Sequence, residues 1–256
     1  MDISQNRIAA ASFAGILHLV TSVLVAAVAA ILVFTIWYPQ PFGDLSGGRN
    51  LFLLIIAVDV ICGPVLTFIV FNPVKPRREL IKDLLLIVLI QIAALVYGAH
   101  ILWKARPLFL VHEVDRFKVI SAPNLNDTDF SNLVGTLRPT FFRGPVTISL
   151  RMPINNEERE LVMRESVLGG RDYAERPEFY VPYDGKNALK SLQRAKPLAV
   201  FLQKQPDQTA AAQKLALEKK ADITQWVYLP VIARQDWIAV LDKQGQIQGF
   251  LKGDGF

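Results

Sequence analysis

The chain has 256 residues, of which 52% are hydrophobic and 20% charged, and its mean hydropathy is +0.30. This composition is too apolar for a typical soluble protein and far too apolar for a disordered one. The net charge of +5 is spread thinly. Because phosphate contacts need clustered Lys and Arg side chains, nucleic-acid binding is not expected. The single cysteine, Cys62, excludes a disulfide within one chain and a cysteine-based metal cluster.

Three apolar segments in residues 1–103 predict a membrane domain. The bilayer core is about 30 Å thick and a helix rises about 1.5 Å per residue, so a spanning helix needs about 20 apolar residues. The predicted spans are 15–36, 51–71 and 84–103. The first could instead be a cleaved signal peptide, but the apolar core of such a peptide covers only about 7–15 residues. The greater length here favours a retained helix and makes the lipid bilayer an expected partner.

The loops between the spans predict the orientation. Cytoplasmic loops carry an excess of Lys and Arg. Loop 72–82 holds four such residues, whereas loop 37–50 holds only Arg49, set against Asp44. The sequence therefore predicts a cytoplasmic N-terminus, with loop 37–50 and residues 104–256 on the outer side.

Residues 104–256 have the size of one domain, and their pattern predicts an α+β fold with a C-terminal antiparallel sheet. Alternating or β-branched apolar runs predict strands, and capped or Ala- and Leu-rich runs predict helices. Extended segments are predicted at 106–120, 146–150, 226–233, 237–241 and 246–251, helices at 156–167, 187–195 and 207–221, and a loop at 124–132.

Asp59 is the most informative single residue, because it lies eight residues into the second predicted span. A carboxylate at mid-membrane costs about 2.5–3.5 kcal/mol on insertion scales, so it is expected to be paired, protonated or functional. One interpretation is a proton relay and a second is a polar contact to a partner helix. A third is a structural hydrogen bond within the bundle, with candidate partners His18, Thr21, Gln91 and His100.

Gly63 and Pro64 follow Asp59 on the same predicted span. Proline lacks the N–H of a helical residue and clashes with the preceding turn, so the pair predicts a kink. The kink could serve only to pack the three helices. It could also form a groove that accepts a helix of another protein.

Catalytic chemistry is poorly supported. The sequence contains no G-x-S-x-G elbow, P-loop or G-x-G-x-x-G pattern, and no cofactor is predicted. Polar residues in 112–115 alternate between the faces of a strand, which is a poor geometry for a metal. The charged run 171–178 is expected to be solvated surface. The one local cluster that a membrane enzyme could use comprises Arg106, His112, Asp115 and Arg116.

Four stretches form a recognisable set. The first is WYPQPF at 37–42, and the second is VDVICGPVLTFIVFNP at 58–73. The third combines ARP at 105–107 with EVDRF at 113–117. The fourth combines DYAERPE at 172–178 with YVP at 180–182. The second is the most specific, because an aspartate inside a span and a Gly-Pro pair four residues further on are each unusual. Through these stretches the chain resembles the type IV pilin accessory proteins of Gram-negative bacteria, the TfpX/TfpZ-type or FimB-like family.

The resemblance implies a non-enzymatic protein of the bacterial inner membrane with a periplasmic C-terminal domain. Members help a type IV pilin to reach or assemble into surface pili, in a manner closer to a chaperone than to a core machine part. The implied partner is the pilin, through its membrane helix and its periplasmic head. Candidate contact residues are Asp59, Gly63, Pro64, Asp115 and Arg116. An unpaired strand edge within 226–251 is a second candidate surface for the pilin head.

Other classes of function remain open. The main alternative is a membrane-anchored sensor or regulatory subunit whose periplasmic domain binds a small ligand, although loop 72–82 offers little length to transmit a signal inward. A transporter would need more than one buried ionisable group and normally more helices.

Overall fold

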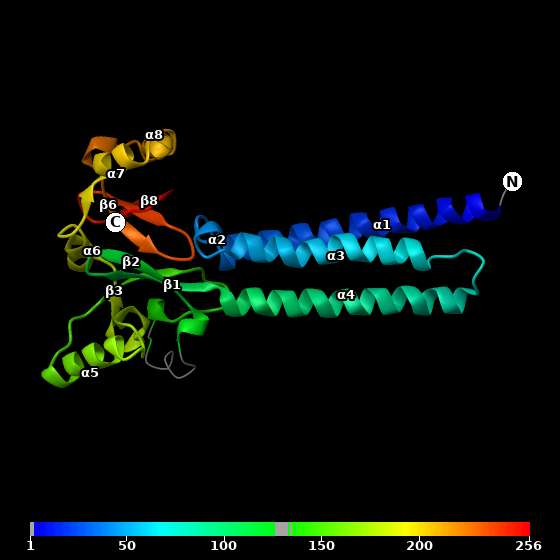
Figure 1. Ribbon diagram of the computed structural model, residues 1–256, viewed down its shortest axis with the longest axis horizontal. Helices are drawn as coiled ribbons and strands as arrows, with labels where there is room; N and C mark the ends of the chain where they lie inside the picture. The colour runs from blue at the N-terminus through cyan, green and yellow to red at the C-terminus, as the bar shows by residue number, and fades with distance from the viewer. Residues whose placement is uncertain (1–2, 126–132, 134) are drawn as a thin grey trace. The chain divides into compact units, whose positions relative to one another are not determined.

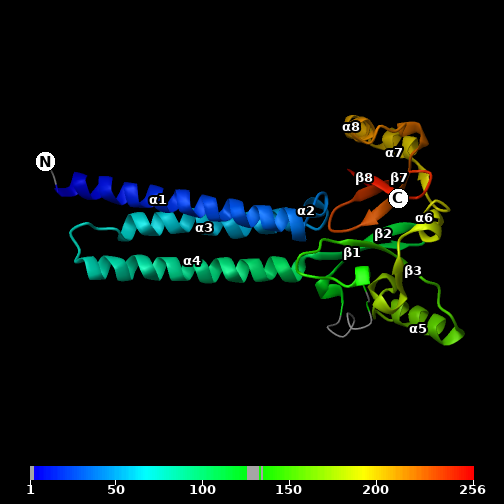
Figure 2. The same cartoon turned by 180° about the vertical axis from the view of Figure 1, so that it is seen from behind.

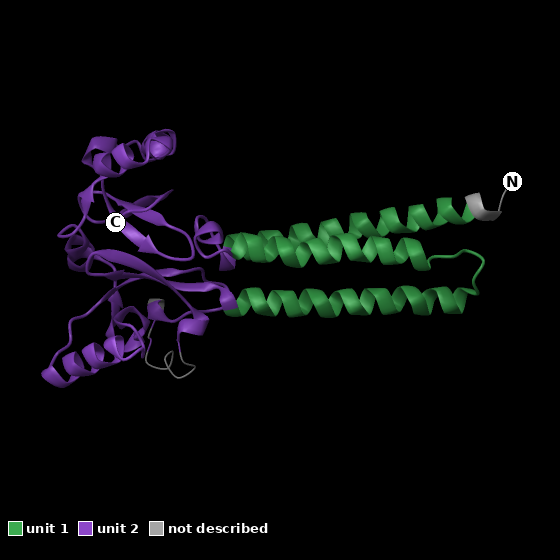
Figure 3. Cartoon of the chain, in the orientation of Figure 1, with its two compact units in different colours: residues 1–35, 48–104 green, residues 36–47, 105–256 purple. Residues whose placement is uncertain are grey.

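The computed structural model describes residues 3–125, 133 and 135–256. These residues form two compact units (Figure 3). Unit 1 contains the described residues of 1–35 together with 48–104, and unit 2 contains 36–47 together with the described residues of 105–256. The segment between the first two long helices therefore folds with the C-terminal part of the chain.

Unit 1 is built from three long apolar helices, each long enough to cross a bilayer. They are α1 (Ile3–Leu32), which continues into the π-helical turn η1 (Val33–Trp37), α3 (Gly48–Val70) and α4 (Arg77–Ala105). The three predicted spans are confirmed as helices. Each α-helix extends beyond at least one end of its predicted span, because hydropathy marks the apolar core of a helix while its backbone hydrogen bonds continue into polar turns. Large apolar side chains such as Phe13 and Val28 are about 70% exposed, as suits lipid contact.

The helices of unit 1 are not evenly spaced. α1 and α3 pack side by side, while α4 runs further from them (Figures 1 and 2). Gly15 of α1 supports the close pair, because a Cβ atom at this position would lie 3.4 Å from the backbone oxygen of Pro64. Small residues allow helix backbones to approach closely in membranes.

Unit 2 is organised around one mixed sheet with the strand order β4-β3-β1-β2-β6-β7-β8, and β5 pairs with β6 beside this path. The strands are β1 (Pro107–Glu113), β2 (Arg116–Ser121), β3 (Val146–Leu150), β4 (Tyr180–Pro182), β5 (Lys196–Pro197), β6 (Val227–Ile232), β7 (Trp237–Leu241) and β8 (Ile247–Lys252). The predicted C-terminal antiparallel strands are confirmed. Parallel pairings of β1 with β3 and of β2 with β6 join them to the earlier strands.

The predicted extended segment 106–120 is in fact two strands. β1 and β2 pair antiparallel, with Glu113 opposite Arg116, and the chain reverses at Val114 and Asp115. Val114 has a φ of +48°, a left-handed conformation that is unusual for a β-branched residue. The reversal was missed because no glycine, asparagine or proline marks it.

Short helices cover parts of the sheet. They are α2 (Phe42–Leu45), α5 (Asn156–Val167), α6 (Gly185–Ser191), α7 (Leu198–Lys204) and α8 (Thr209–Lys219). Short 3-10 turns lie between elements: η2 (Ala122–Asn124), η4 (Gly135–Leu137), η5 (Tyr173–Glu175), η6 (Pro177–Phe179), η7 (Pro206–Gln208) and η8 (Ile223–Gln225). α5 has its predicted bounds, and the side chain of Asn155 caps it by accepting a hydrogen bond from the backbone N–H of Glu158 at 2.8 Å.

Two helix predictions need adjustment, and one helix was missed. The predicted helix 187–195 begins at Gly185 and ends at Ser191, and the predicted helix 207–221 is confined to α8 because Pro206 opens a 3-10 turn. α7 was not predicted, since seven residues hold too little periodicity to separate a helix from an apolar run. The predicted loop 124–132 falls largely outside the described residues.

The core of unit 2 lies on both faces of the sheet, because β1 is buried along six of its seven residues. One cluster contains Phe109, Val111, Ile120 and Ile148. The opposite cluster contains Leu110, Phe117, Leu229 and Leu241 of the sheet together with Phe42 and Leu45 of α2. A third cluster packs beneath α7 and α8. Since a bilayer cannot divide one hydrophobic core, segment 36–47 and the strands lie on the same side of the membrane.

Candidate functional site

Polar side chains converge inside unit 1 from all three long helices. They border a cavity of about 240 Å³ between α1, α3 and α4. Its lining combines polar and aliphatic residues: His18, Thr21, Ser22, Val25, Asp59, Val88, Gln91, Ile92 and Leu95. Three of the four bonding partners proposed for Asp59 from the sequence therefore lie around this cavity, and His100 does not line it.

Asp59 keeps an unsatisfied oxygen in this setting. The side-chain amide of Gln91 donates a hydrogen bond to the backbone oxygen of Asp59 at 3.1 Å. The Oδ1 atom of Asp59 is buried and has no hydrogen-bond partner among the described residues. A buried acceptor without a donor costs about 1–3 kcal/mol. The cavity therefore lacks one donor that an additional group could supply.

A second polar contact ties α1 to α3 about two turns along α3 from Asp59. The imidazole Nδ1 of His18 lies 2.5 Å from the hydroxyl oxygen of Thr67, and Thr67 is buried. Ser22 is also buried on the same side of α1. His18 is thus held by its own bundle and is oriented beside the carboxylate of Asp59.

Gly63 has a packing role that the structure makes specific. A Cβ atom at this position would lie 1.8 Å from Nε2 of Gln91 and 3.1 Å from Nε2 of His18. Glycine is therefore needed for Gln91 to reach α3. The helix continues through Pro64 to Val70, and Pro64 leaves the carbonyl of Val60 without its usual donor four residues later.

Asp115 and Arg116 belong to the other unit, at the turn between β1 and β2. Arg116 donates two hydrogen bonds to the carboxylate of Asp115, at 2.7 and 3.1 Å. These bonds lower the pKa of Asp115. The guanidinium also lies 5.1 Å from the ring centroid of Phe256. Asp115 and Arg116 largely satisfy each other's hydrogen-bonding capacity. They are therefore weaker candidates than Asp59 for contact with a partner protein.

The four residues of the possible enzyme cluster do not form one site. Arg106 precedes β1 and His112 lies near its far end, so their backbones are about 20 Å apart at about 3.3 Å per residue. Arg106 is buried, and desolvation lowers its pKa to about 10, an effect opposed by the nearby Tyr38. Only His112, Asp115 and Arg116 share one end of the strand.

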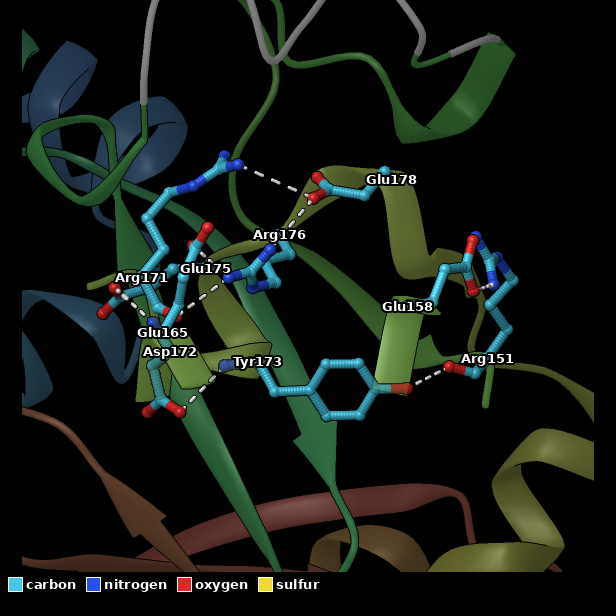
Figure 4. A network of polar contacts seen from close by, with 9 residues as sticks. All are labelled: Arg151, Glu158, Glu165, Arg171, Asp172, Tyr173, Glu175, Arg176 and Glu178. Atoms are coloured by element: carbon cyan, nitrogen blue, oxygen red, sulfur yellow. Dashed lines mark hydrogen bonds and ion pairs between the residues drawn. The ribbon is translucent and has the colours of Figure 1, made fainter. Parts of the chain in front are cut away.

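The charged run 171–178 is not the solvated surface expected from its composition. Figure 4 shows it as a network of ion pairs. The side chain of Arg176 is 1% exposed, pairs closely with Glu165 of α5, and approaches Glu178 at 3.6 Å. The expectation was wrong because local composition cannot show that Arg176 is buried and pairs with Glu165 of α5.

Two further contacts extend this network into the sheet. Lys118 of β2 donates hydrogen bonds to Asp172 at 2.7 Å and to Glu175 at 3.0 Å. The hydroxyl of Tyr173 donates to the backbone oxygen of Arg151, as Figure 4 shows. The run therefore fixes η5 and the segment leading to α5 against β2, and its role is structural.

Sequence reasoning missed Ser22 and Thr67 as members of the intramembrane cluster. A signal was present, because Asp59, Gly63 and Thr67 recur every four residues and so share one face of α3. On α1 the same spacing relates His18 to Ser22. Polar and small residues at this spacing mark the face of a membrane helix that meets its neighbours.

Together, the helical unit and the sheet unit define a membrane-anchored protein whose folded domain is completed by the segment between its first two helices. The chain belongs to the FimB family of fimbrial assembly proteins, as the resemblance predicted. The family model described as "Fimbrial assembly protein FimB" matches residues 6–47, which cover most of α1 and the segment that enters unit 2.

Relatives of this chain come from Dichelobacter nodosus. The fimbrial assembly protein of serogroup I is 34% identical over 256 residues, with 98% of each chain covered. The protein of serogroup E1 is 33% identical with the same coverage. The protein of serogroups C1 and C2 is 44% identical over 117 residues, which make up 46% of this chain and 88% of that relative. No solved structure matches the chain.

Proposed function

We infer that the protein has a role in pilus assembly, which its membership of this family supports. We propose that the protein is a non-catalytic, chaperone-like factor of the bacterial inner membrane that holds a type IV pilin during assembly. Its N-terminus is cytoplasmic and unit 2 lies in the periplasm. The four basic residues of loop 72–82 support this orientation.

The observation that carries the proposal is the unsatisfied Oδ1 of Asp59 between apolar helices. A pilin, in this proposal, waits in the membrane on one apolar helix. A hydroxyl, amide or amine group on that helix would supply the missing donor. Hydrogen bonds to charged groups contribute about 1.5–3 kcal/mol, which is enough to favour one helix over the surrounding lipid.

The sheet offers a second contact in the same proposal. β8 closes one end of the strand order and pairs with β7 alone among the described strands. An open strand edge can accept an extended segment of another chain through backbone hydrogen bonds. β8 therefore supports a contact to the pilin head, consistent with the predicted role of region 226–251.

In-cell photo-crosslinking in the native host tests direct contact. Probes are placed at Leu66 and Ile69, which are exposed on α3, and at Gln248 and Phe250 on β8. Met163, exposed on α5, is the control position in unit 2. The expected result is a pilin-containing band from the α3 or β8 probes and none from the control. Absence of pilin from every probe, at normal protein levels, would overturn the proposal and favour the sensor alternative.

The variant Asp59→Leu tests the membrane contact separately. Loss of about 1.5–3 kcal/mol should weaken pilin association roughly tenfold to a hundredfold and reduce surface pili. Thr21→Val is the matched control, because Thr21 lines the same cavity but donates its hydroxyl to Leu17 of its own helix at 2.9 Å. Pilin crosslinking is compared at equal protein levels. Unchanged crosslinking and piliation in Asp59→Leu would rule out this contact.

A further inference from the structure

A second cavity, of about 350 Å³, lies in unit 2 and has no part in the proposed pilin contacts. Its polar lining comes from β1, β3, η5 and the end of α6: His112, Ser149, Tyr173, Lys190, Gln193 and Arg194. His112 and Ser149 are register partners on parallel strands, so their side chains leave the sheet on the same face. Both are at least 95% buried.

His112 presents an unsatisfied nitrogen at this cavity. Its ring packs against Phe117 and Tyr183, with centroid distances of 5.3 and 5.9 Å. Burial lowers its pKa to about 4, so the imidazole is neutral at neutral pH. The backbone of Val114 accepts its one N–H. The remaining Nε2 is an acceptor and has no hydrogen-bond partner among the described residues.

Two cations, Lys190 and Arg194, border the same cavity. Lys190 donates a hydrogen bond only to the neutral amide oxygen of Asn187, at 3.1 Å, in the part of the chain that the structure describes. Neither cation forms an ion pair at contact distance within the described residues, and the carboxylate of Asp115 acts on Arg194 only at longer range. The positive charge of Lys190 also contributes to the lowered pKa of His112, which places the two groups close together.

The rest of the lining is apolar and comes from Val114, Leu150 and Met152. We propose that this cavity binds an organic carboxylate that carries a hydrogen-bond donor beside the carboxyl group and an apolar side chain. Lys190 and Arg194 hold the carboxylate, Nε2 of His112 accepts the donor, and the apolar residues cover the side chain. An N-acylated amino acid and the C-terminal residue of a peptide share this chemistry.

The test uses the full-length protein in detergent micelles, labelled with 15N-histidine, and follows the Nε2 resonance of His112 alongside calorimetric titration. The probe is N-acetyl-leucine, and it is expected to bind saturably and shift the resonance. N-acetyl-leucinamide lacks the carboxylate and hexanoate lacks the donor, so each should bind at least tenfold more weakly. Inorganic phosphate should not compete. A peptide that ends in leucine distinguishes the two possible natural ligands. If it binds at least as tightly as N-acetyl-leucine, the ligand is a peptide C-terminus. If it binds more weakly, the ligand is a free N-acylated amino acid.

Variants of the lining residues locate the site. Lys190→Gln combined with Arg194→Gln should weaken N-acetyl-leucine binding at least tenfold, and so should His112→Phe, which keeps the aromatic packing. Lys214→Gln is the control, because Lys214 is 79% exposed on α8 and does not line this cavity. No saturable binding, equal affinity for the acid and its amide, or affinity unchanged in the double variant would each overturn the proposal. Pilus assembly does not enter the measurement, so its outcome is independent of the proposed function.

Discussion

At the residue scale, Gly63 shows how a single missing side chain organises the intramembrane cluster. A Cβ atom would occupy the place of the Gln91 amide, which bonds to the backbone of Asp59. A glycine is therefore required at position 63 because the Gln91 side chain of α4 approaches the backbone of α3 there. Its value for a partner helix is indirect, because it keeps Gln91 and Asp59 in place.

We predict that Gly63→Ala destabilises the helical unit by about 1–2 kcal/mol, the range found for interhelical hydrogen bonds in model peptides. The added methyl displaces Gln91 and breaks its bond to Asp59. The double variant Gly63→Ala with Gln91→Ala should be no less stable than Gly63→Ala, because this hydrogen bond is already lost in the single variant and the steric conflict is removed. Unfolding in detergent, followed by helical circular dichroism, measures both. A double variant less stable than Gly63→Ala would contradict the steric explanation.

His112 is the residue whose burial has the clearest consequence for stability. Its pKa is about 4 in the folded protein, because burial disfavours the charged imidazole and Lys190 adds repulsion, against weaker opposing effects of Val114 and Asp115. In the unfolded chain the pKa is close to 6.5. The unfolded state therefore binds more protons between these two values.

We predict that the free energy of unfolding falls as the pH drops from about 6.5 to 4, by about 3 kcal/mol from this residue. Above pH 6.5 the imidazole is neutral in both states and contributes no pH dependence. His112→Phe should show a shallower loss over the same interval. Urea unfolding at a series of pH values gives the comparison. Equal slopes for the two proteins would show that His112 is not held neutral.

At the element scale, segment 36–47 is a structural part of unit 2. Phe42 and Leu45 of α2 belong to the core formed with β1, β2, β6 and β7. The backbone N–H of Arg234 donates to the carbonyl of Leu45 at 3.1 Å. α1 and α3 are thus joined to each other through an element that is packed into the sheet.

We predict that Leu45→Ala destabilises unit 2 by about 2–5 kcal/mol, because Leu45 is fully buried and truncation leaves a cavity. Leu217→Ala is the matched control. Leu217 is 78% exposed on α8, so its loss should change stability by less than about 0.5 kcal/mol. Tryptophan fluorescence reports the transition, since Trp37, Trp226 and Trp237 lie in unit 2. Similar midpoints for the two variants would contradict the assignment of α2 to the core.

At the scale of the whole molecule, the shared core places segment 36–47 and the sheet in one compartment. In the proposed topology the three long helices span the bilayer, which puts loop 72–82 in the opposite compartment. In the proposed orientation, loop 72–82 is cytoplasmic and unit 2 is periplasmic.

Cysteine labelling of a Cys62→Ser background tests this arrangement. We predict that Gln40→Cys and Gln244→Cys react with a membrane-impermeant thiol reagent in spheroplasts, since both positions are exposed in unit 2. Val74→Cys, 73% exposed in loop 72–82, should react only after permeabilisation. Opposite reactivity of Gln40→Cys and Gln244→Cys would refute the shared core. Labelling of Val74→Cys alone in intact spheroplasts would reverse the orientation.

The amino-acid sequence by itself determined the features that depend on neighbouring residues. Some 20 consecutive apolar residues can be satisfied only by a helix in lipid, so the three spans were predictable. The apolar runs of β6 and β7 were equally local, and motifs such as that around Asp59 and Gly63 were sufficient to indicate the family. Tertiary structure alone decided that Phe42 completes a distant core, that Arg176 is buried, and that His112 meets Lys190 at a cavity. The physical reason is that desolvation and ion pairing depend on which segments pack together, and residues far apart in sequence supply those contacts.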